Sequence, residues 1–163
     1  MADTISLTLS ANGTNILGDS SVSTLERANK LEVLSFDQNV SRAFDRATLQ
    51  ATGRRIYAPI RFTKRLDRAT PLLRKALINN EVIEGNFRWF RPSPAADGTT
   101  QHFMTLTFTQ ARITKCVLRL PDTLGADTAT LPPMEEIEMT AGTWTWTWIP
   151  GGIEFHDTVV VTP

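Results

Sequence analysis

Apolar and polar residues alternate in short runs along most of the chain, which is the pattern of β-strands with one buried face. The first run places Ile5, Leu7 and Leu9 between serine and threonine residues, and the turn signal Asn12-Gly13 ends it. Further strands are predicted at about residues 30–40, 82–90, 102–112, 113–120, 135–139, 143–149 and 153–161.

Two long connections interrupt the predicted strands. Residues 42–55 are polar and basic, and this segment exceeds the usual connection of about four to six residues, so we expect it to be mobile or held by another molecule. Residues 121–133 form the second long connection. In the strand at 30–40 the apolar pattern changes phase between Val33 and Leu34, which predicts a bulge or a strand buried on both faces.

The segment 55–80 combines a strand, a stop and a helix. Alternation in IYAPIRFT predicts a strand at residues 56–63. The period then changes: Thr70 is the predicted N-cap, and Pro71 takes the first helical position, where its missing amide hydrogen costs nothing. Because apolar residues recur at helical spacing after Pro71, we expect one α-helix that begins at about Pro71 and ends at about Asn79.

Eight or nine short strands and one helix are typical of a mainly β fold, built as two packed sheets or as a barrel. No repeat, linker or low-complexity segment divides the 163 residues, so we expect a single domain at residues 1–163. In TWTWTW, residues 143–148, three indoles point one way and three hydroxyls the other. We expect these indoles in the core; an exposed aromatic platform for a ligand is the alternative.

The composition indicates a soluble protein that folds in the cytosol. A single cysteine, Cys116, excludes an internal disulfide, and its place in an alternating run predicts a small buried hydrophobe. The N-terminus lacks the basic start and apolar run of a signal peptide, and no stretch approaches the ~20 apolar residues of a membrane span. The formal net charge is zero, which argues against general attraction to nucleic acid or membranes.

Residues suited to catalysis are scarce, with two histidines, one cysteine and one tyrosine. His102 and His156 are far apart in the sequence and have no ligand spacing around them, so His156-Asp157 is expected to be an ordinary strand-end pair rather than a catalytic or metal site. The three glutamates at 135–138 are expected at a solvated or interface edge rather than in acid/base catalysis. We therefore expect no catalytic residue, cofactor or metal.

Charge is distributed unevenly along the chain. Ten of the seventeen lysines and arginines lie in residues 42–75, together with only two acids, and the interleaved aromatic residues allow a nucleic-acid interpretation. Residues 120–163 contain no lysine or arginine but seven acids: Asp122, Asp127, Glu135, Glu136, Glu138, Glu154 and Asp157. The opposite charges are satisfied within the monomer or head to tail between copies, and a head-to-tail contact closes into a ring or runs on as a filament.

Residues 59–73, PIRFTKRLDRATPLL, are similar to the strand, Phe-Thr-Lys, Asp and Thr-Pro-Leu run that leads into the single helix of the haemolysin-coregulated protein family, Hcp, the tube protein of bacterial type VI secretion. The C-terminal part also resembles a family ending in which an aromatic strand turns at a glycine pair. Thr158 is a departure, because many relatives have an aromatic residue there. The residues that carry the resemblance are Phe62, Thr63, Lys64, Asp67, Thr70, Pro71, Leu72, Trp146, Trp148, Gly151, Gly152 and Asp157.

The resemblance implies two antiparallel sheets in a barrel-like sandwich with one flanking helix. It also implies hexameric rings that stack into a tube, which a contractile sheath propels, a valine-glycine repeat spike caps and effector proteins can occupy. Residues 42–55 would be the family's extended loop, reaching toward the next subunit or ring. The expected contacts between subunits or rings are Arg42, Arg46, Arg54, Arg55, Glu135, Glu136 and Glu138.

The same resemblance implies assembly in the bacterial cytoplasm and release to the extracellular space or a target cell without a cleaved signal peptide. It implies no nucleic-acid partner, no membrane insertion and no enzymatic activity. A tail-tube protein of a related phage-like contractile particle is the near alternative. A non-assembling β-sandwich binding module is the remote one, and copy number in solution separates it from the tube proteins.

Overall fold

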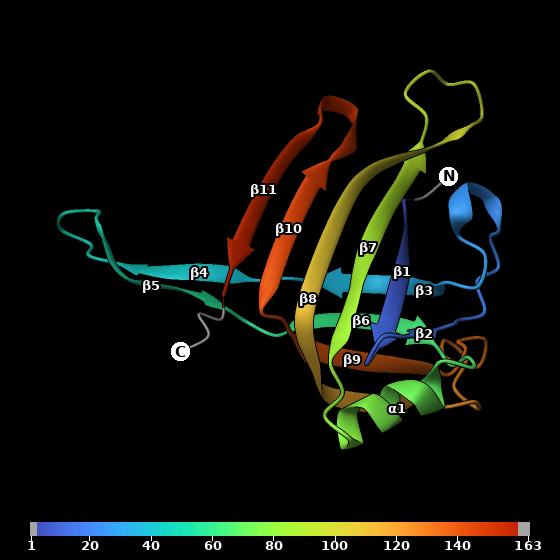
Figure 1. Ribbon diagram of the computed structural model, residues 1–163. Coiled ribbons are helices and arrows are strands. Elements are labelled where there is room, and N and C mark those ends of the chain that lie inside the picture. Colours follow the sequence, from blue (N-terminus) through green and yellow to red (C-terminus); the bar gives the residue numbers. More distant parts are fainter. Residues whose placement is uncertain (1–2, 160–163) are drawn as a thin grey trace.

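The computed structural model describes residues 3–159, which form one long antiparallel sheet, a separate hairpin and an α-helix (Figure 1). The mainly β class is therefore confirmed. The sheet strands are β1 (Thr4–Ala11), β2 (Thr14–Ile16), β3 (Leu31–Asp37), β6 (Ile60–Arg65), β7 (Ile83–Pro92), β8 (Thr100–Arg119), β9 (Met134–Thr140), β10 (Thr143–Trp148) and β11 (Ile153–Thr158). The hairpin consists of β4 (Val40–Phe44) and β5 (Ala51–Tyr57), the helix is α1 (Thr70–Ile78), and the short 3-10 turns are η1 (Thr24–Glu26) and η2 (Ile149–Gly151).

The long sheet closes on itself as a barrel. Its strand order is β11-β10-β8-β7-β1-β3-β6-β9, with β2 paired to β1, and β9 also pairs with β8. Closure is possible because β8 is long: its first half pairs with β7 and β10, and its second half pairs with β9. The two sheets expected from the sequence are thus parts of one continuous sheet. β10 and β11 extend it beyond the closed barrel (Figure 1).

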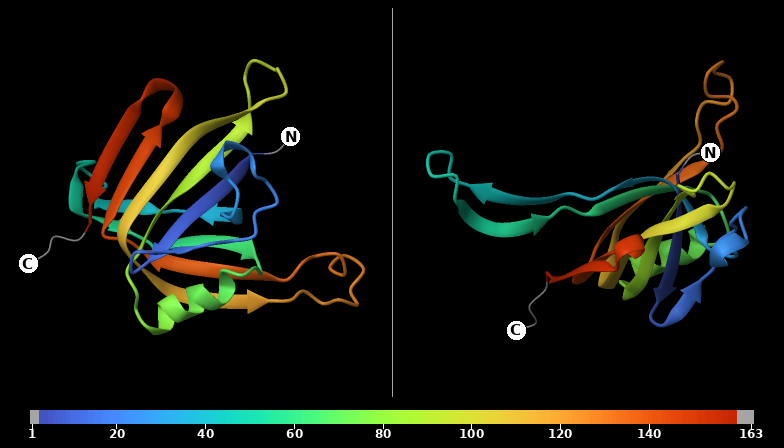
Figure 2. Two further views of the ribbon diagram at one scale, coloured as in Figure 1. Left: turned by 45° about the vertical axis from the view of Figure 1, so that its right-hand side comes forward. Right: turned by 90° about the horizontal axis from the view of Figure 1, so that it is seen from above.

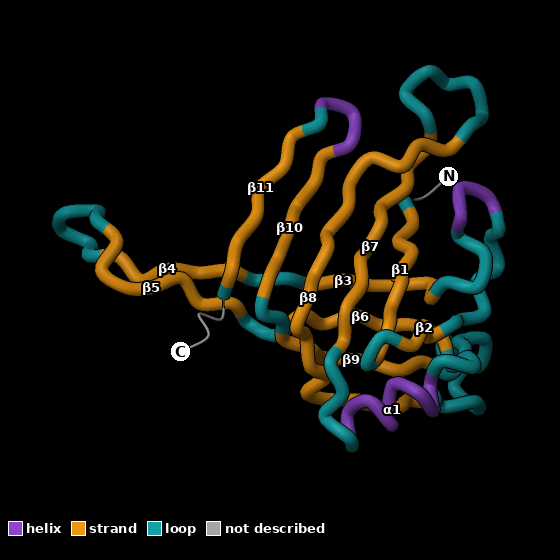
Figure 3. The backbone as a smooth tube through the Cα atoms, viewed as in Figure 1, coloured by secondary structure: helices purple, strands orange, loops and turns teal. Residues whose placement is uncertain are grey.

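Alternation along the strands supplies the core, because every second side chain points into the barrel. Burying one such Leu, Ile or Phe side chain contributes about 1.5–3 kcal/mol. The helix α1 packs on β8 across one end of the barrel (Figures 1 and 3) and buries Leu73 and Ala76. The almost completely buried residues include Leu7, Leu9, Leu31, Ile60, Phe62, Phe87, Leu106, Phe108, Ile137, Met139 and Trp144.

Three expectations about where strands begin and end, or about which segments are connections, are wrong. The strand expected at 56–63 is divided into β5 and β6 by Ala58 and Pro59, and the missing amide hydrogen of Pro59 explains the break. The strands expected at 102–112 and 113–120 are one strand, β8, with a register shift between Ile113 and Lys115. The segment 42–55 is not a loop, because its two ends pair as β4 and β5. Residues 160–161 of the last predicted strand lie outside the described residues.

Other predicted features are confirmed in place. The register of β3 shifts between Val33 and Ser35, so the expected bulge exists. The helix begins one residue earlier and ends one residue earlier than expected, at Thr70 and Ile78. Thr70 is not the N-cap, which is Ala69 and makes no side-chain capping bond. The Asp67 carboxylate accepts the Ala69 amide hydrogen at 2.9 Å, which orders the turn immediately before the helix.

Candidate assembly surfaces

The β4–β5 hairpin, residues 40–57, is named the arm because it projects far beyond the barrel (Figures 1 and 2). Within the described residues the arm forms a separate two-stranded sheet and pairs with no other strand. An isolated hairpin is marginally stable in water. Its apolar side chains are nevertheless largely exposed: Val40 by 45%, Phe44 by 58%, Leu49 by 78% and Ile56 by 62%. These features indicate a contact surface for another molecule.

The base of the arm is attached to β11 by a charged pair. Arg55 donates from Nε and Nη2 to the Asp157 carboxylate, and Nη2 also donates to the Thr158 carbonyl oxygen at 2.7 Å. The Tyr57 hydroxyl donates to the same carboxylate, and its ring stacks on Trp144 and Trp146 with centroids 6.0 and 6.3 Å apart. This cluster sets the direction in which the arm leaves the barrel.

The electrostatics of this cluster follow from its contacts. Burial, followed by the hydrogen bond to Asp157, raises the pKa of Tyr57 to about 12. The Arg55 guanidinium and then the Tyr57 hydroxyl hold the pKa of Asp157 below its usual range. His156-Asp157 is thus a strand-end pair in which the aspartate serves the arm. The His156 ring meets the Thr145 hydroxyl at 2.8 Å and the Thr158 hydroxyl at 3.3 Å.

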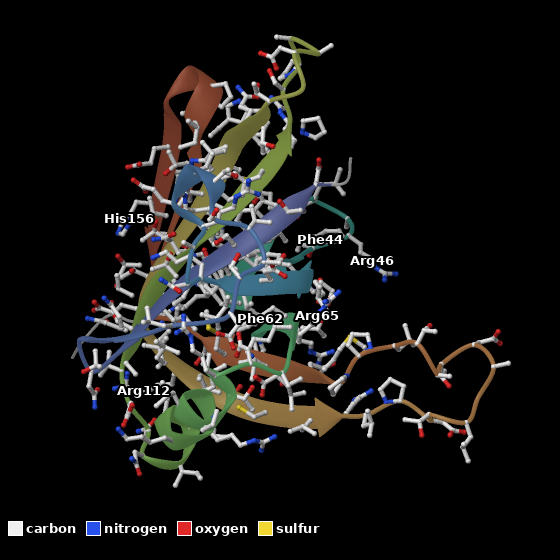
Figure 4. All side chains as sticks on the ribbon, turned by 90° about the vertical axis from the view of Figure 1, so that its right-hand side faces the viewer. Phe44, Arg46, Phe62, Arg65, Arg112 and His156 are labelled. Carbon is white, nitrogen blue, oxygen red and sulfur yellow. The ribbon has the colours of Figure 1, made fainter. Side chains whose placement is uncertain are left out.

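The remaining arm arginines, Arg42, Arg46 and Arg54, form no ion pair with any described residue. Arg42 donates to the Gly53 carbonyl oxygen across the hairpin at 2.8 Å. Figure 4 shows Phe44 and Arg46 of the arm extending away from the barrel interior, where Phe62 is labelled. The basic segment identified from the sequence is therefore a protruding cationic surface.

Lys64 has a different role, because its side chain is completely buried. Its ammonium group forms an ion pair with Glu135 at 2.6 Å and donates to Asp67 at 2.7 Å, the Arg65 carbonyl oxygen at 2.9 Å and the Thr70 hydroxyl at 3.3 Å. The Thr70 hydroxyl in turn donates to Glu135 at 2.7 Å. The Phe-Thr-Lys, Asp and Thr-Pro-Leu motif therefore encodes a buried network that connects β6, the start of α1 and β9.

The three glutamates of β9 have different surroundings. Glu135 is fully buried against Lys64, so the expectation that it lies at a solvated or interface edge is wrong. The sequence concealed this pair because the partners are 71 positions apart and only the β6–β9 register, Lys64 opposite Glu135, brings them together. Glu138 is paired with Arg61 at 3.1 Å and Lys115 at 3.4 Å. Glu136 is partly buried, and its contact with another copy stays a prediction.

The TWTWTW strand spans the change from core to surface. Trp144 is 1% exposed, as expected for a core position, whereas Trp148 is 39% exposed. Trp146 lies between them, donates to the Gln38 side-chain oxygen at 3.1 Å and stacks on Phe155. Gly152 adopts a φ of +63° at the turn into β11, a left-handed conformation that favours glycine. Ile153 and Phe155 are exposed on the same face as the indoles.

The strands β1, β7, β8, β10 and β11 share one outer face, opposite to the core residues and the indoles, and this face is continuously polar. The pairing register aligns small hydroxyl side chains from strand to strand, with a few amide and charged groups among them. His156 points outward on this face in Figure 4. The alternation predicted polar positions in single strands, but only the strand order shows that they share one broad surface. Its residues are Ser6, Thr8, Ser10, Glu84, Asn86, Arg88, Thr105, Thr107, Thr109, Thr143, Thr145, Thr147, Glu154, His156 and Thr158.

His102 and Cys116, the remaining side chains suited to reaction, contact neighbouring strand residues and the core. The Nε2 atom of His102 lies 3.1 Å from the Met104 carbonyl oxygen, which can only accept a hydrogen bond, and 2.9 Å from the Thr105 hydroxyl. Burial lowers the pKa of His102. Cys116 is half-buried against the core, and burial, followed by the Glu135 charge, raises the pKa of its thiol. Residues 3–159 contain no group of three His, Cys, Asp or Glu side chains arranged to hold a metal ion. Nor does any helix in this part of the chain have the length and apolar character to cross a membrane.

Comparison with known proteins identifies the family to which the chain is similar. The family model for "Type VI secretion system effector, Hcp" matches residues 8–148. A curated relative, the "Major exported protein" of Pseudomonas aeruginosa strain PAO1, is 29% identical over 120 residues, which cover 73% of this chain and 69% of the relative.

Solved structures share the fold over nearly the whole chain. An Hcp protein crystal structure superposes with a TM-score of 0.85 at 20% identity, covering 99% of this chain and 100% of the other. A mutant of the Hcp1 protein from E. coli EAEC 042 gives a TM-score of 0.81 at 24% identity, covering 96% and 99%. The secreted protein Hcp3 from Pseudomonas aeruginosa gives 0.74 at 20% identity, covering 96% and 98%.

Proposed function

The chain belongs to the Hcp family of type VI secretion system effectors, and on that basis we propose that it is the structural subunit of a secreted tube, in which hexameric rings stack. The observation that carries this proposal is the arm. Within the described residues this hairpin has no partner strand and exposes four large apolar side chains and three unpaired arginines. Such a surface is costly in a monomer and is covered when copies associate.

The contacts that build the tube come from the arm. Arg42, Arg46 and Arg54 provide charge that orients the next copy, because charge pairs at an interface set register and approach more than affinity. Arg55 acts indirectly, since its bond to Asp157 fixes the arm's direction. Glu136 and Glu138 lie on β9 and complete the proposed set, although Glu138 already has two partners within the chain.

The broad polar face is proposed as the wall of the tube lumen. It presents mainly serine and threonine hydroxyls, with neither a large apolar patch nor a strong excess of one charge. A surface of this kind stays hydrated and does not hold a passing protein tightly. Effector proteins carried in the lumen can therefore be released after ejection. The spike protein and the contractile sheath are the further proposed partners, and neither nucleic acid nor a membrane is a partner.

The chain acts in this proposal as a single domain with a structural rather than a catalytic role. It assembles in the bacterial cytoplasm and then leaves the cell, in keeping with the name of its relative, the major exported protein. Export as part of a tube requires no cleaved signal peptide. The buried residues of the motif, Phe62, Lys64 and Thr70, then serve the stability of each subunit.

Electron microscopy with negative stain, combined with light scattering for the mass, tests this function. Six-membered rings or stacked tubes of the purified chain are the expected result. The informative variant replaces residues 43–53 of the arm by a short Gly-rich turn, which leaves the barrel intact and is expected to remove rings. A wild-type chain that stays monomeric at every concentration would contradict the proposal and favour a non-assembling binding module.

A further inference from the structure

We infer that the arm of one copy docks on the loop at residues 120–133 of a second copy, with the carboxylates of that loop entering an arginine-lined cavity at the base of the arm. This segment between β8 and β9 is named the acidic loop. The inference rests on the proposed function, because it specifies one contact through which the subunits join.

The cavity lies where the arm meets β11. It has a volume of about 320 Å³ and is lined by Arg42, Arg54, Arg55, Thr158 and Val159. Three arginines therefore line a small space, and Arg42 and Arg55 are cross-strand partners on one face of the hairpin. Of these arginines, Arg55 alone is neutralised within the described residues, by Asp157. Planar guanidinium groups favour carboxylate partners that accept two hydrogen bonds at once. The unneutralised cavity thus fits one or two carboxylates from outside the subunit.

The acidic loop offers such carboxylates. It contains Asp122 and Asp127 and no basic residue. Neither aspartate forms an ion pair with another residue in the described range 3–159. The loop also has internal order: the Asp122 carboxylate accepts the Leu124 amide hydrogen at 2.9 Å, and the Thr128 hydroxyl donates to the Asp122 carbonyl oxygen at 2.6 Å. A preformed loop loses less conformational entropy when it binds.

The two surfaces also match in their apolar side chains. Leu124 is 94% exposed, Leu120 is 62% exposed and Leu131 is 45% exposed, on a loop that has no strand to hide them. The arm exposes Phe44 and Ile56 beside its arginines. Each surface thus combines apolar groups with one sign of charge, and the signs are opposite. Covering both sets of apolar groups supplies affinity, while the charges select the orientation.

One molecule cannot make this contact with itself. The arm and the acidic loop leave the barrel on opposite sides and point in different directions (Figure 2). Figure 4 shows the acidic loop extending freely away from the barrel. The contact is therefore between unlike surfaces of two copies, which is the heterologous type that generates rings or filaments.

Two charge-reversal variants test the contact. The arm variant combines Arg42→Glu with Arg54→Glu, and the loop variant combines Asp122→Lys with Asp127→Lys. Each variant alone places like charges in the contact, so each is expected to need at least about tenfold more protein to assemble than the wild type. Circular dichroism and thermal unfolding verify that both variants keep the fold. Asp3→Lys with Asp97→Lys changes the net charge by the same amount as the loop variant at two exposed positions outside the proposed contact, and this control is expected to assemble normally.

Mixing the two variants gives the decisive result. An acidic arm then meets a basic loop and a basic arm meets an acidic loop, so equimolar mixing is expected to restore assembly with alternating copies. Sedimentation velocity measures it, and raised salt is expected to weaken it. Wild-type rings with unaffected variants, or two defective variants that fail to rescue each other, would overturn the inference but not the proposed function. A wild-type chain without self-association would overturn both.

Discussion

Replacement of Lys64 by methionine is expected to lower the free energy of unfolding by about 3–5 kcal/mol, the cost of removing one partner from a buried ion pair. Methionine fills a similar volume without the charge. The Lys64 ammonium is the single cation between Glu135 and Asp67, at 2.6 and 2.7 Å. Its loss leaves two carboxylates close together in the barrel wall, with the Thr70 hydroxyl as a remaining donor to Glu135.

Glu135→Gln is expected to cost less, about 1–3 kcal/mol, which is the range for disturbing buried hydrogen bonds. The reason is the charge balance, because Lys64 keeps its bond to Asp67 and forms a one-to-one pair after the change. One oxygen of Glu135, Oε2, already lacks a hydrogen-bond partner among residues 3–159. The double variant Lys64→Met with Glu135→Gln is expected to be more stable than Lys64→Met alone, because it no longer leaves the buried Glu135 carboxylate without a cation.

Urea unfolding at a fixed low protein concentration measures these differences, because association raises the apparent stability. For a chain of this size the Lys64→Met effect corresponds to a fall in the unfolding temperature of roughly 6–20 °C. Arg61→Met is the matched control, because Arg61 pairs with Glu138 on the same strands but is 61% exposed. Its expected cost is below about 1 kcal/mol. If Glu135→Gln costs as much as Lys64→Met, the charge-balance reasoning is refuted.

Two further predictions concern Tyr57 and Thr70. Tyr57 is the single tyrosine, so the absorbance titration of its hydroxyl is expected to have a midpoint near 12 in the folded protein and about 10 in the unfolded chain. Because the folded pKa is the higher one, the contribution of Tyr57 to the free energy of unfolding is complete below pH 10 and is lost as the pH rises toward 12. Asp157→Asn is expected to lower the folded midpoint but to leave it above 10, because burial is the larger cause; an unchanged midpoint would remove the hydrogen bond from the account. Thr70→Val is expected to lower stability by about 1–3 kcal/mol by deleting the hydroxyl, whereas Thr70→Ser stays near the wild type. A Thr70→Val protein as stable as the wild type would refute the role of the hydroxyl.

The interpretation of Thr70 shows where sequence reasoning reaches its limit. A threonine before a proline at a helix start is a good N-cap pattern, and the helix is where the pattern placed it. The hydroxyl instead bonds to Glu135, 65 residues away. Local spacing identified the residue as important for the right element but could not reveal a partner from another strand.

The candidate surfaces show the same limit. The sequence located the basic segment and the acid-rich C-terminal part, and the family motif pointed to assembly. It could not show that residues 42–55 pair into an arm, because strand propensity in a polar segment is weak. It also grouped Glu135 with exposed acids, whereas the exposed, unpaired carboxylates of that half of the chain include Asp122 and Asp127.

The sequence by itself determined the mainly β class, the approximate strands, the single helix, the bulge in β3 and the resemblance to the Hcp family, because these depend on the period of apolar residues and on local motifs. Tertiary structure decided the rest. Closure of the barrel depends on β8 pairing with both β7 and β9, and the Lys64 network and the polar face depend on strand register. Register is set by contacts between residues far apart in the chain, and a short window of sequence does not contain them.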